Sequence, residues 1–118
     1  MVTAKEAFEA RKLAAKYGVP GKVAALYRMA GYIIDVISTD EDAPIHFKAS
    51  KRRESLAVKV YWRSGRVSPE LVEGVAGRAK ELNSKPVLVL YGSGPRITQD
   101  ALNRAKELGV SIRRVRPS

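Results

Sequence analysis

The apolar residues at the start of the chain recur at helical spacing, and they predict two helices. The first covers residues 3–17, where Thr3 and Glu6 fit a capping box. The second covers residues 22–30, after a break predicted at residues 19–21, which include a proline and a glycine. Both helices are expected to pack their apolar side against a core.

Strand patterns follow. Residues 32–38 are rich in β-branched side chains, which favours a strand. In residues 45–50 and 56–63 apolar and polar side chains alternate. This alternation predicts a β-hairpin whose turn is the basic segment 51–54.

The second half alternates between helix and strand. The predicted elements are a helix over residues 69–82, a strand over 86–91, a helix over 99–108 and a strand over 110–115. Gly74 and Gly77 interrupt the first of these helices, and we expect them to allow close approach to the sheet. Three strands before a crossover helix predict a single α/β domain over residues 1–118. Its mixed sheet of about five strands is flanked by helices in the order ααβββαβαβ, with an N-terminal helix in 1–20 and a core in 21–115.

The net charge of the chain indicates a class of binding partner. The chain has a formal net charge of +10, a field that attracts polyanions. The excess is uneven: residues 31–47 carry four acids and no base, whereas residues 48–66 carry seven bases against Glu54 alone. The predicted hairpin is therefore the densest basic segment. The alternative is a solvated basic surface without a partner.

Composition also bears on the compartment. The chain has no cysteine, which fits a reducing compartment, and no apolar run of the roughly 20 residues needed to cross a bilayer. No secretory signal is visible at the N-terminus. We therefore expect a cytoplasmic protein with no membrane partner. Scarce Asn and Gln beside many charged residues are typical of thermophiles.

Six segments carry a resemblance to a known family. They are residues 30–32, 45–49, 56–61, 64–68, 85–90 and 98–110. Their order and spacing over residues 21–115 resemble the PD-(D/E)xK, or restriction-endonuclease-like, superfamily. The likeness is closest to its Mrr-like branch, to which the archaeal Holliday-junction resolvases are related. The resemblance implies a nuclease-type fold that acts on DNA.

The same resemblance places the family's catalytic motif on three residues that depart from it. The family holds Mg²⁺ with an Asp on the second strand and an acidic residue or Gln on the third, and a Lys follows two residues later. Those positions are His46, Lys59 and Tyr61 in this chain. The resemblance therefore implies that the metal-binding motif is lost, that no catalytic residue remains, and that no cofactor is needed. Alternation predicts that the three side chains could share one strand face.

Such a face would carry positive charge and an aromatic ring to a phosphate. The predicted nucleic-acid-binding residues are Lys48, Lys51, Arg52, Arg53, Lys59, Tyr61, Arg63 and Arg66. Trp62 lies on the opposite face and is expected in the core. On this basis Lys59→Glu should weaken DNA binding more than Lys85→Glu.

Other interpretations stay open. His46 could be a packed or hydrogen-bonded sheet residue, and Lys59 an exposed residue paired with Asp35. The chain could be a Mg²⁺-dependent endonuclease with a relocated site, for which Asp35, Asp42 and Glu54 are the candidate ligands. It could also be a non-catalytic scaffold or homodimer subunit.

Overall fold

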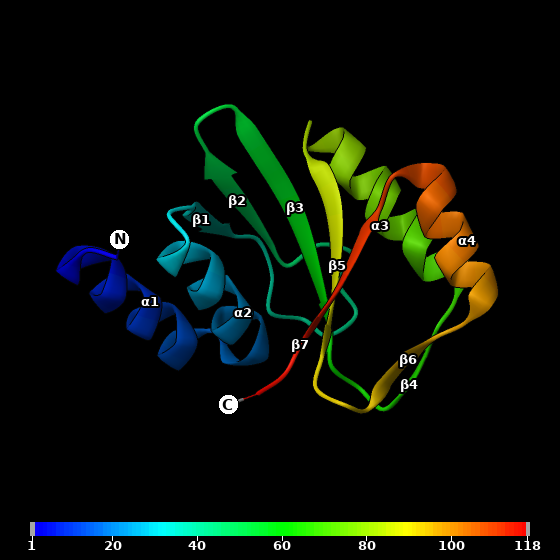
Figure 1. Cartoon of the computed structure of the whole chain (residues 1–118), viewed down its shortest axis with the longest axis horizontal. Coiled ribbons are helices and arrows are strands. Elements are labelled where there is room, and N and C mark those ends of the chain that lie inside the picture. Colours follow the sequence, from blue (N-terminus) through cyan, green and yellow to red (C-terminus); the bar gives the residue numbers. More distant parts are fainter. Residues whose placement is uncertain (1, 118) are drawn as a thin grey trace.

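A five-stranded sheet separates two layers of helices in the computed structural model, which describes residues 2–117 (Figure 1). The helices are α1 (Ala4–Lys16), α2 (Gly18–Met29), α3 (Pro69–Glu81) and α4 (Gln99–Leu108). The strands of the main sheet are β1 (Ile33–Val36), β2 (Phe47–Lys51), β3 (Glu54–Tyr61), β5 (Lys85–Tyr91) and β7 (Ser111–Val115). Two short strands, β4 (Gly65–Val67) and β6 (Pro95–Ile97), form a separate parallel pair.

The strand order is β1-β2-β3-β5-β7. The first three strands form an antiparallel meander, and β5 and β7 add to it in parallel through the crossover helices α3 and α4. The predicted mixed sheet flanked by helices is confirmed. The β4–β6 pair was not predicted, because each strand has only three residues and lies in what the sequence marks as a loop.

Each face of the sheet buries its own core. On one face α2 packs against alternate residues of β2, β3 and β5, among them Phe47 and Val58. On the other face α3 and α4 pack against the intervening residues, among them Ala57 and Leu88. Trp62 packs at the margin of the α2 core, as expected. The alternation of β3 between two buried faces explains why it lies in the middle of the sheet.

The boundary between the first two helices differs from the prediction. No break occurs at residues 19–21, because α2 already begins at Gly18, which has a left-handed φ of 63°. Pro20 lies in the first turn of α2, where a helix needs no backbone N–H donor. Gly21 is required for close packing: a Cβ on it would lie 2.1 Å from the backbone oxygen of Leu13.

The two glycines of α3 do not have the role predicted for them. Both are exposed, and a Cβ added to Gly74 or Gly77 would meet nothing within 4 Å. Neither glycine approaches the sheet, so that prediction is wrong. Their cost to helix stability, roughly 1 kcal/mol each relative to Ala, is not offset by packing.

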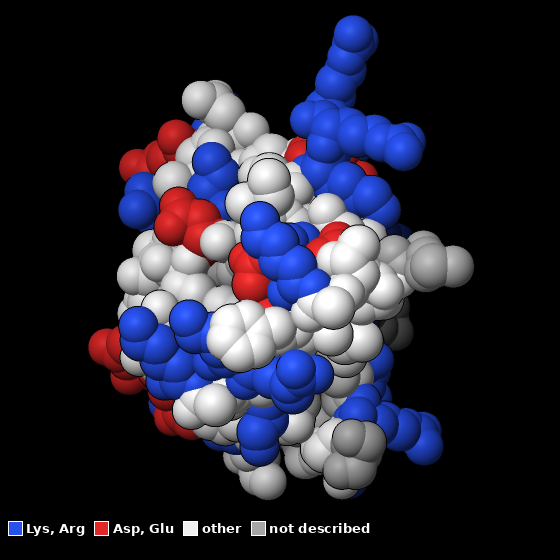
Figure 2. Space-filling view, turned by 90° about the vertical axis from the view of Figure 1, so that its left-hand side faces the viewer, with Lys and Arg blue, Asp and Glu red and all other residues white. Residues whose placement is uncertain are grey.

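α1 lies at the outer side of α2. Its predicted capping box is confirmed, since the Thr3 side chain accepts from the Glu6 backbone N–H and Glu6 accepts from that of Thr3. Seen from the α1 side, Lys and Arg gather in several patches between uncharged surface and smaller acidic groups (Figure 2). Within residues 2–117, no helix combines the length and apolarity that crossing a membrane requires.

Candidate nucleic-acid interface

His46 directly precedes β2, and both of its ring nitrogens are hydrogen-bonded. Nδ1 accepts a hydrogen bond from the Val60 backbone N–H at 3.0 Å, and Nε2 lies 2.8 Å from the backbone oxygen of Asp40. A carbonyl oxygen can only accept, so the proton is on Nε2. The ring is fully buried, with its centroid 5.4 Å from that of Trp62. The interpretation of His46 as a packed, hydrogen-bonded residue is confirmed.

The chain changes direction at His46. Ile45 packs in the core beneath α3, whereas Phe47, two residues on, packs in the core beneath α2. A regular strand would place both on one face, so the alternation breaks here. The imidazole lies beside Trp62, while Tyr61 packs against the α3 core. The prediction that His46 shares one face with Lys59 and Tyr61 is therefore wrong.

Burial also sets the charge of His46. Removal from water lowers the pKa of the imidazole to about 4, because the protonated form loses its hydration. The ring is therefore neutral at pH 7. Its one lone pair faces the Val60 N–H, so the ring has none to offer a metal ion.

Lys59 is an internal cation. Its Nζ donates to the backbone oxygens of Glu41 at 2.8 Å and Ala43 at 2.6 Å, and the residue is only 3% exposed. Burial lowers the pKa of the ammonium, and the carboxylate of Asp42 opposes this shift. The prediction of an exposed Lys59 is wrong, because the loop over residues 39–44 folds over its side chain.

Arg63 is a second cation that binds the loop over residues 39–44, which we call the acidic loop. Its guanidinium bonds to the carboxylate of Glu41, with Nε at 3.0 Å, and to that of Asp42 at 2.9 Å. The loop therefore lies between Lys59 on its carbonyl groups and Arg63 on its carboxylates. A small pocket of about 230 Å³ remains here, lined by Lys59, Tyr61 and Gly74 among others.

The three candidate metal ligands lie apart. Asp42 binds Arg63, Glu54 accepts from the Tyr32 hydroxyl at 3.2 Å, and Asp35 lies opposite Lys48 in the β1–β2 register. The partners of Lys59 are the backbone oxygens of Glu41 and Ala43, and not Asp35. Residues 2–117 contain no group of three or more side chains placed to hold a metal ion. With an ammonium at the motif position, these residues do not fit Mg²⁺.

The predicted basic face is divided between the two ends of β3. Lys51, Arg52 and Arg53 lie at the hairpin turn, whereas Lys59 and Arg63 lie at the opposite end, beside the acidic loop (Figure 1). The eight residues of β3 separate the two ends by about 23 Å.

The remaining predicted residues differ in their exposure and in whether their side chains already form hydrogen bonds. Lys51 donates to the backbone oxygen of Ala30 at 2.8 Å. Lys48 is half-buried, and Arg66 is exposed in β4, opposite Arg96. Arg52, exposed at the turn, has a left-handed φ of 55°.

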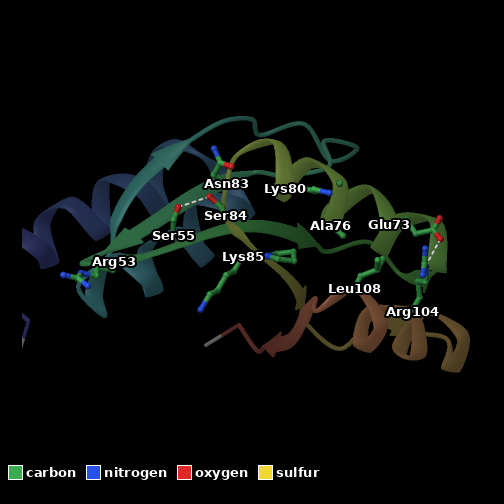
Figure 3. Close-up of a pocket in the computed structure, with 12 residues that line it drawn as sticks. Arg53, Ser55, Glu73, Ala76, Lys80, Asn83, Ser84, Lys85, Arg104 and Leu108 are labelled. Atoms are coloured by element: carbon green, nitrogen blue, oxygen red, sulfur yellow. Dashed lines mark hydrogen bonds and ion pairs between the residues drawn. The ribbon is translucent and has the colours of Figure 1, made fainter.

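One concavity begins at the hairpin turn. This hairpin groove, about 840 Å³ in volume, runs between the hairpin, α3 and α4. Its charged and hydroxyl lining residues are Arg53, Ser55, Glu73, Lys80, Ser84, Lys85 and Arg104. Figure 3 shows Arg53 at one end, Arg104 paired with Glu73 at 2.8 Å at the other, and Lys80 and Lys85 between them.

Three cations of the hairpin groove are available to a ligand. Within residues 2–117, Arg53, Lys80 and Lys85 form no ion pair within 4.0 Å. The hydroxyls of Ser55 and Ser84 lie 2.8 Å apart between them. Sequence reasoning missed Lys80 and Lys85, because residues 67–100 carry equal numbers of acids and bases.

Comparisons with protein-family models, with curated proteins and with solved structures found no match to this chain. The geometry of the groove therefore indicates what kind of ligand it could bind. Guanidinium, ammonium and hydroxyl groups in a row are the donors that proteins use to bind phosphate oxygens.

Proposed function

We propose that this protein binds nucleic acid, DNA in particular, in the hairpin groove, and that it does so without cutting the strand. The observation that carries this proposal is the set of three cations along an open groove, Arg53, Lys80 and Lys85, which form no ion pair within residues 2–117. A row of cations matches the repeating charge of a phosphate backbone. The net charge of +10 adds long-range attraction.

The resemblance to PD-(D/E)xK nucleases supports DNA as the partner. Membership of that superfamily is part of the proposal. Two of the three motif positions have internal roles in this chain: His46 completes the hydrogen bonding of Val60, and Lys59 holds the acidic loop. These roles favour binding over cleavage, because phosphodiester cleavage in this family depends on a metal held by carboxylates.

Recognition of this kind should depend little on sequence. Contacts to phosphates fix the position of the strand but do not distinguish bases. We therefore expect unrelated DNA sequences of equal length to bind with similar affinity, and the affinity to fall steeply with salt.

The test is fluorescence anisotropy with labelled duplex, single-stranded and branched DNA over a range of salt concentrations. The variant Arg53→Gln/Lys80→Gln/Lys85→Gln should bind roughly tenfold more weakly and show a salt slope reduced by about 2 to 3. The control Lys5→Gln/Lys12→Gln/Lys16→Gln loses the same charge on α1 and should bind within about threefold of the wild type.

Equal losses in the two variants would overturn the assignment to the groove, since total charge alone would then explain binding. Parallel incubations with Mg²⁺ or Mn²⁺ test cleavage. Metal-dependent cutting that disappears in Asp35→Ala or Glu54→Ala would replace this proposal with the endonuclease alternative.

A further inference from the structure

α1 extends beyond the edge of the sheet. It packs along α2 and makes few contacts with any strand, whereas α2 covers β1, β2 and β3. In Figure 1, α1 lies at the outer margin of the fold, beyond α2, and β1 is the first strand of the sheet. A groove of about 480 Å³ separates α1 from β1.

The edge of β1 is open. Within residues 2–117, β1 pairs only with β2, so alternate backbone N–H and C=O groups along its outer side have no strand partner. Ile33 is 71% exposed and Ile37 is 38% exposed, although both are large apolar residues. An unpaired edge with exposed apolar side chains is a template for a further strand.

The helical wall of the groove is basic. Lys5, Lys12 and Lys16 line it. Both carboxylates of α1, Glu6 and Glu9, are bonded to Arg28. Among residues 2–117, none of the three lysines has an acidic partner within 4.0 Å.

We propose that an extended acidic segment of a partner protein adds a strand to the edge of β1 beneath α1. Its backbone would continue the ladder, and its carboxylates would meet Lys5, Lys12 and Lys16. This site is separate from the hairpin groove. A nucleic acid cannot form a β-ladder, and a second copy of β1 would bring one carboxylate, Asp35, to three lysines.

The probe is a labelled peptide of about eight residues that alternates valine and glutamate, with both ends blocked, measured by fluorescence anisotropy against the full chain. The matched peptides replace glutamate with lysine, or carry N-methyl groups on alternate residues that remove the donors of one edge. We expect binding of the acidic peptide and at least roughly tenfold weaker binding of both matched peptides.

Two protein variants separate this site from the nucleic-acid site. Lys5→Gln/Lys12→Gln/Lys16→Gln should weaken peptide binding about tenfold, while Arg53→Gln/Lys80→Gln/Lys85→Gln should leave it within about twofold. The opposite pattern is expected for DNA, so either proposal can fail alone.

Three results would overturn this inference. The first is equal affinity for the acidic and the N-methylated peptide, which would exclude strand addition. The second is equal loss of peptide binding in the two variants. The third is a stable dimer of the chain alone that the acidic peptide does not dissociate, since a second copy would then occupy the edge.

Discussion

The two ends of β3 use positive charge in different ways. At the end beside the acidic loop, Lys59 and Arg63 are bonded to oxygen atoms of the loop. At the hairpin end, Arg53 lies in a groove with Lys80 and Lys85, and within residues 2–117 none of the three is paired with an acid. One end is closed by internal bonds, and the other is open to a ligand.

A count of basic residues does not show which of them are free to bind a phosphate. A cation that already holds a carbonyl or a carboxylate must lose those bonds before it can bind a phosphate, and a buried one must also be exposed. An unpaired surface cation releases only water and counterions. We therefore expect the closed end to contribute to stability, and the open end to contribute to the binding we propose.

The largest expected effect is at the closed end. Lys59→Glu would place a carboxylate against the backbone oxygens of Glu41 and Ala43, and we expect the free energy of unfolding to fall by at least about 4 kcal/mol. Urea denaturation measures this loss. Lys85→Glu, the same change at the open end, should alter stability by less than about 0.5 kcal/mol. Equal stability of the two variants would contradict the comparison.

A second effect follows from the neutral imidazole. The unfolded chain protonates His46 near pH 6.5 and the folded chain only at about 4, so the unfolded state binds more protons between these values. Stability should be complete above pH 6.5 and fall by about 3 kcal/mol as the pH drops to 4.

His46 is the single histidine of the chain, so its NMR titration is unambiguous. Denaturation curves between pH 7 and pH 4, compared with those of His46→Gln, isolate its contribution. An imidazole that titrates near pH 6.5 in the folded protein would show that it is not closed off from water.

A smaller effect concerns DNA affinity. Lys85→Gln should weaken binding by about twofold to fivefold and reduce the salt slope by about 1. Arg63→Gln removes the same charge from the closed end and should change the affinity by less than about twofold. Anisotropy titrations at two salt concentrations compare the variants. A larger effect of Arg63→Gln would favour the motif end as the interface.

The smallest effect uses the glycines of α3. Gly74 lines the pocket at Lys59, and Gly77 lines the hairpin groove. With no atom within 4 Å of an added Cβ, each change to alanine should stabilise the protein by about 0.5–1 kcal/mol. Only Gly77→Ala should also weaken DNA binding, because a methyl group would enter the groove. Thermal denaturation with the same DNA assay separates these results.

Local signals made much of the fold predictable from the sequence. The capping box, the hairpin and the mixed sheet depend on residues close together in the chain or on simple alternation. The burial of Lys59 depends instead on backbone carbonyl groups of a loop 16 to 18 residues earlier, which carry no side-chain signature.

The cations of the hairpin groove were harder to predict, because the fold brings them together from separate segments of the chain. Lys80 and Lys85 reach the groove only because α3 and β5 bring them beside Arg53, and nothing in their own segments marks them. The sequence-based order of effects, with Lys59→Glu above Lys85→Glu in DNA binding, is reversed in our proposal because the ammonium of Lys59 is inside the protein.

The contacts of the Arg28 guanidinium have a consequence for the motion of α1. Arg28 bonds to Glu6 and Glu9 of α1 and to the backbone oxygen of Tyr32 just before β1, while α1 itself has one fully buried side chain, Ala10. Salt screens such contacts far more than it weakens an apolar core. Amide hydrogens of α1 should therefore exchange with solvent sooner than those of β3, and sooner still at high ionic strength. The width of the groove between α1 and β1 would then depend on the salt around the protein.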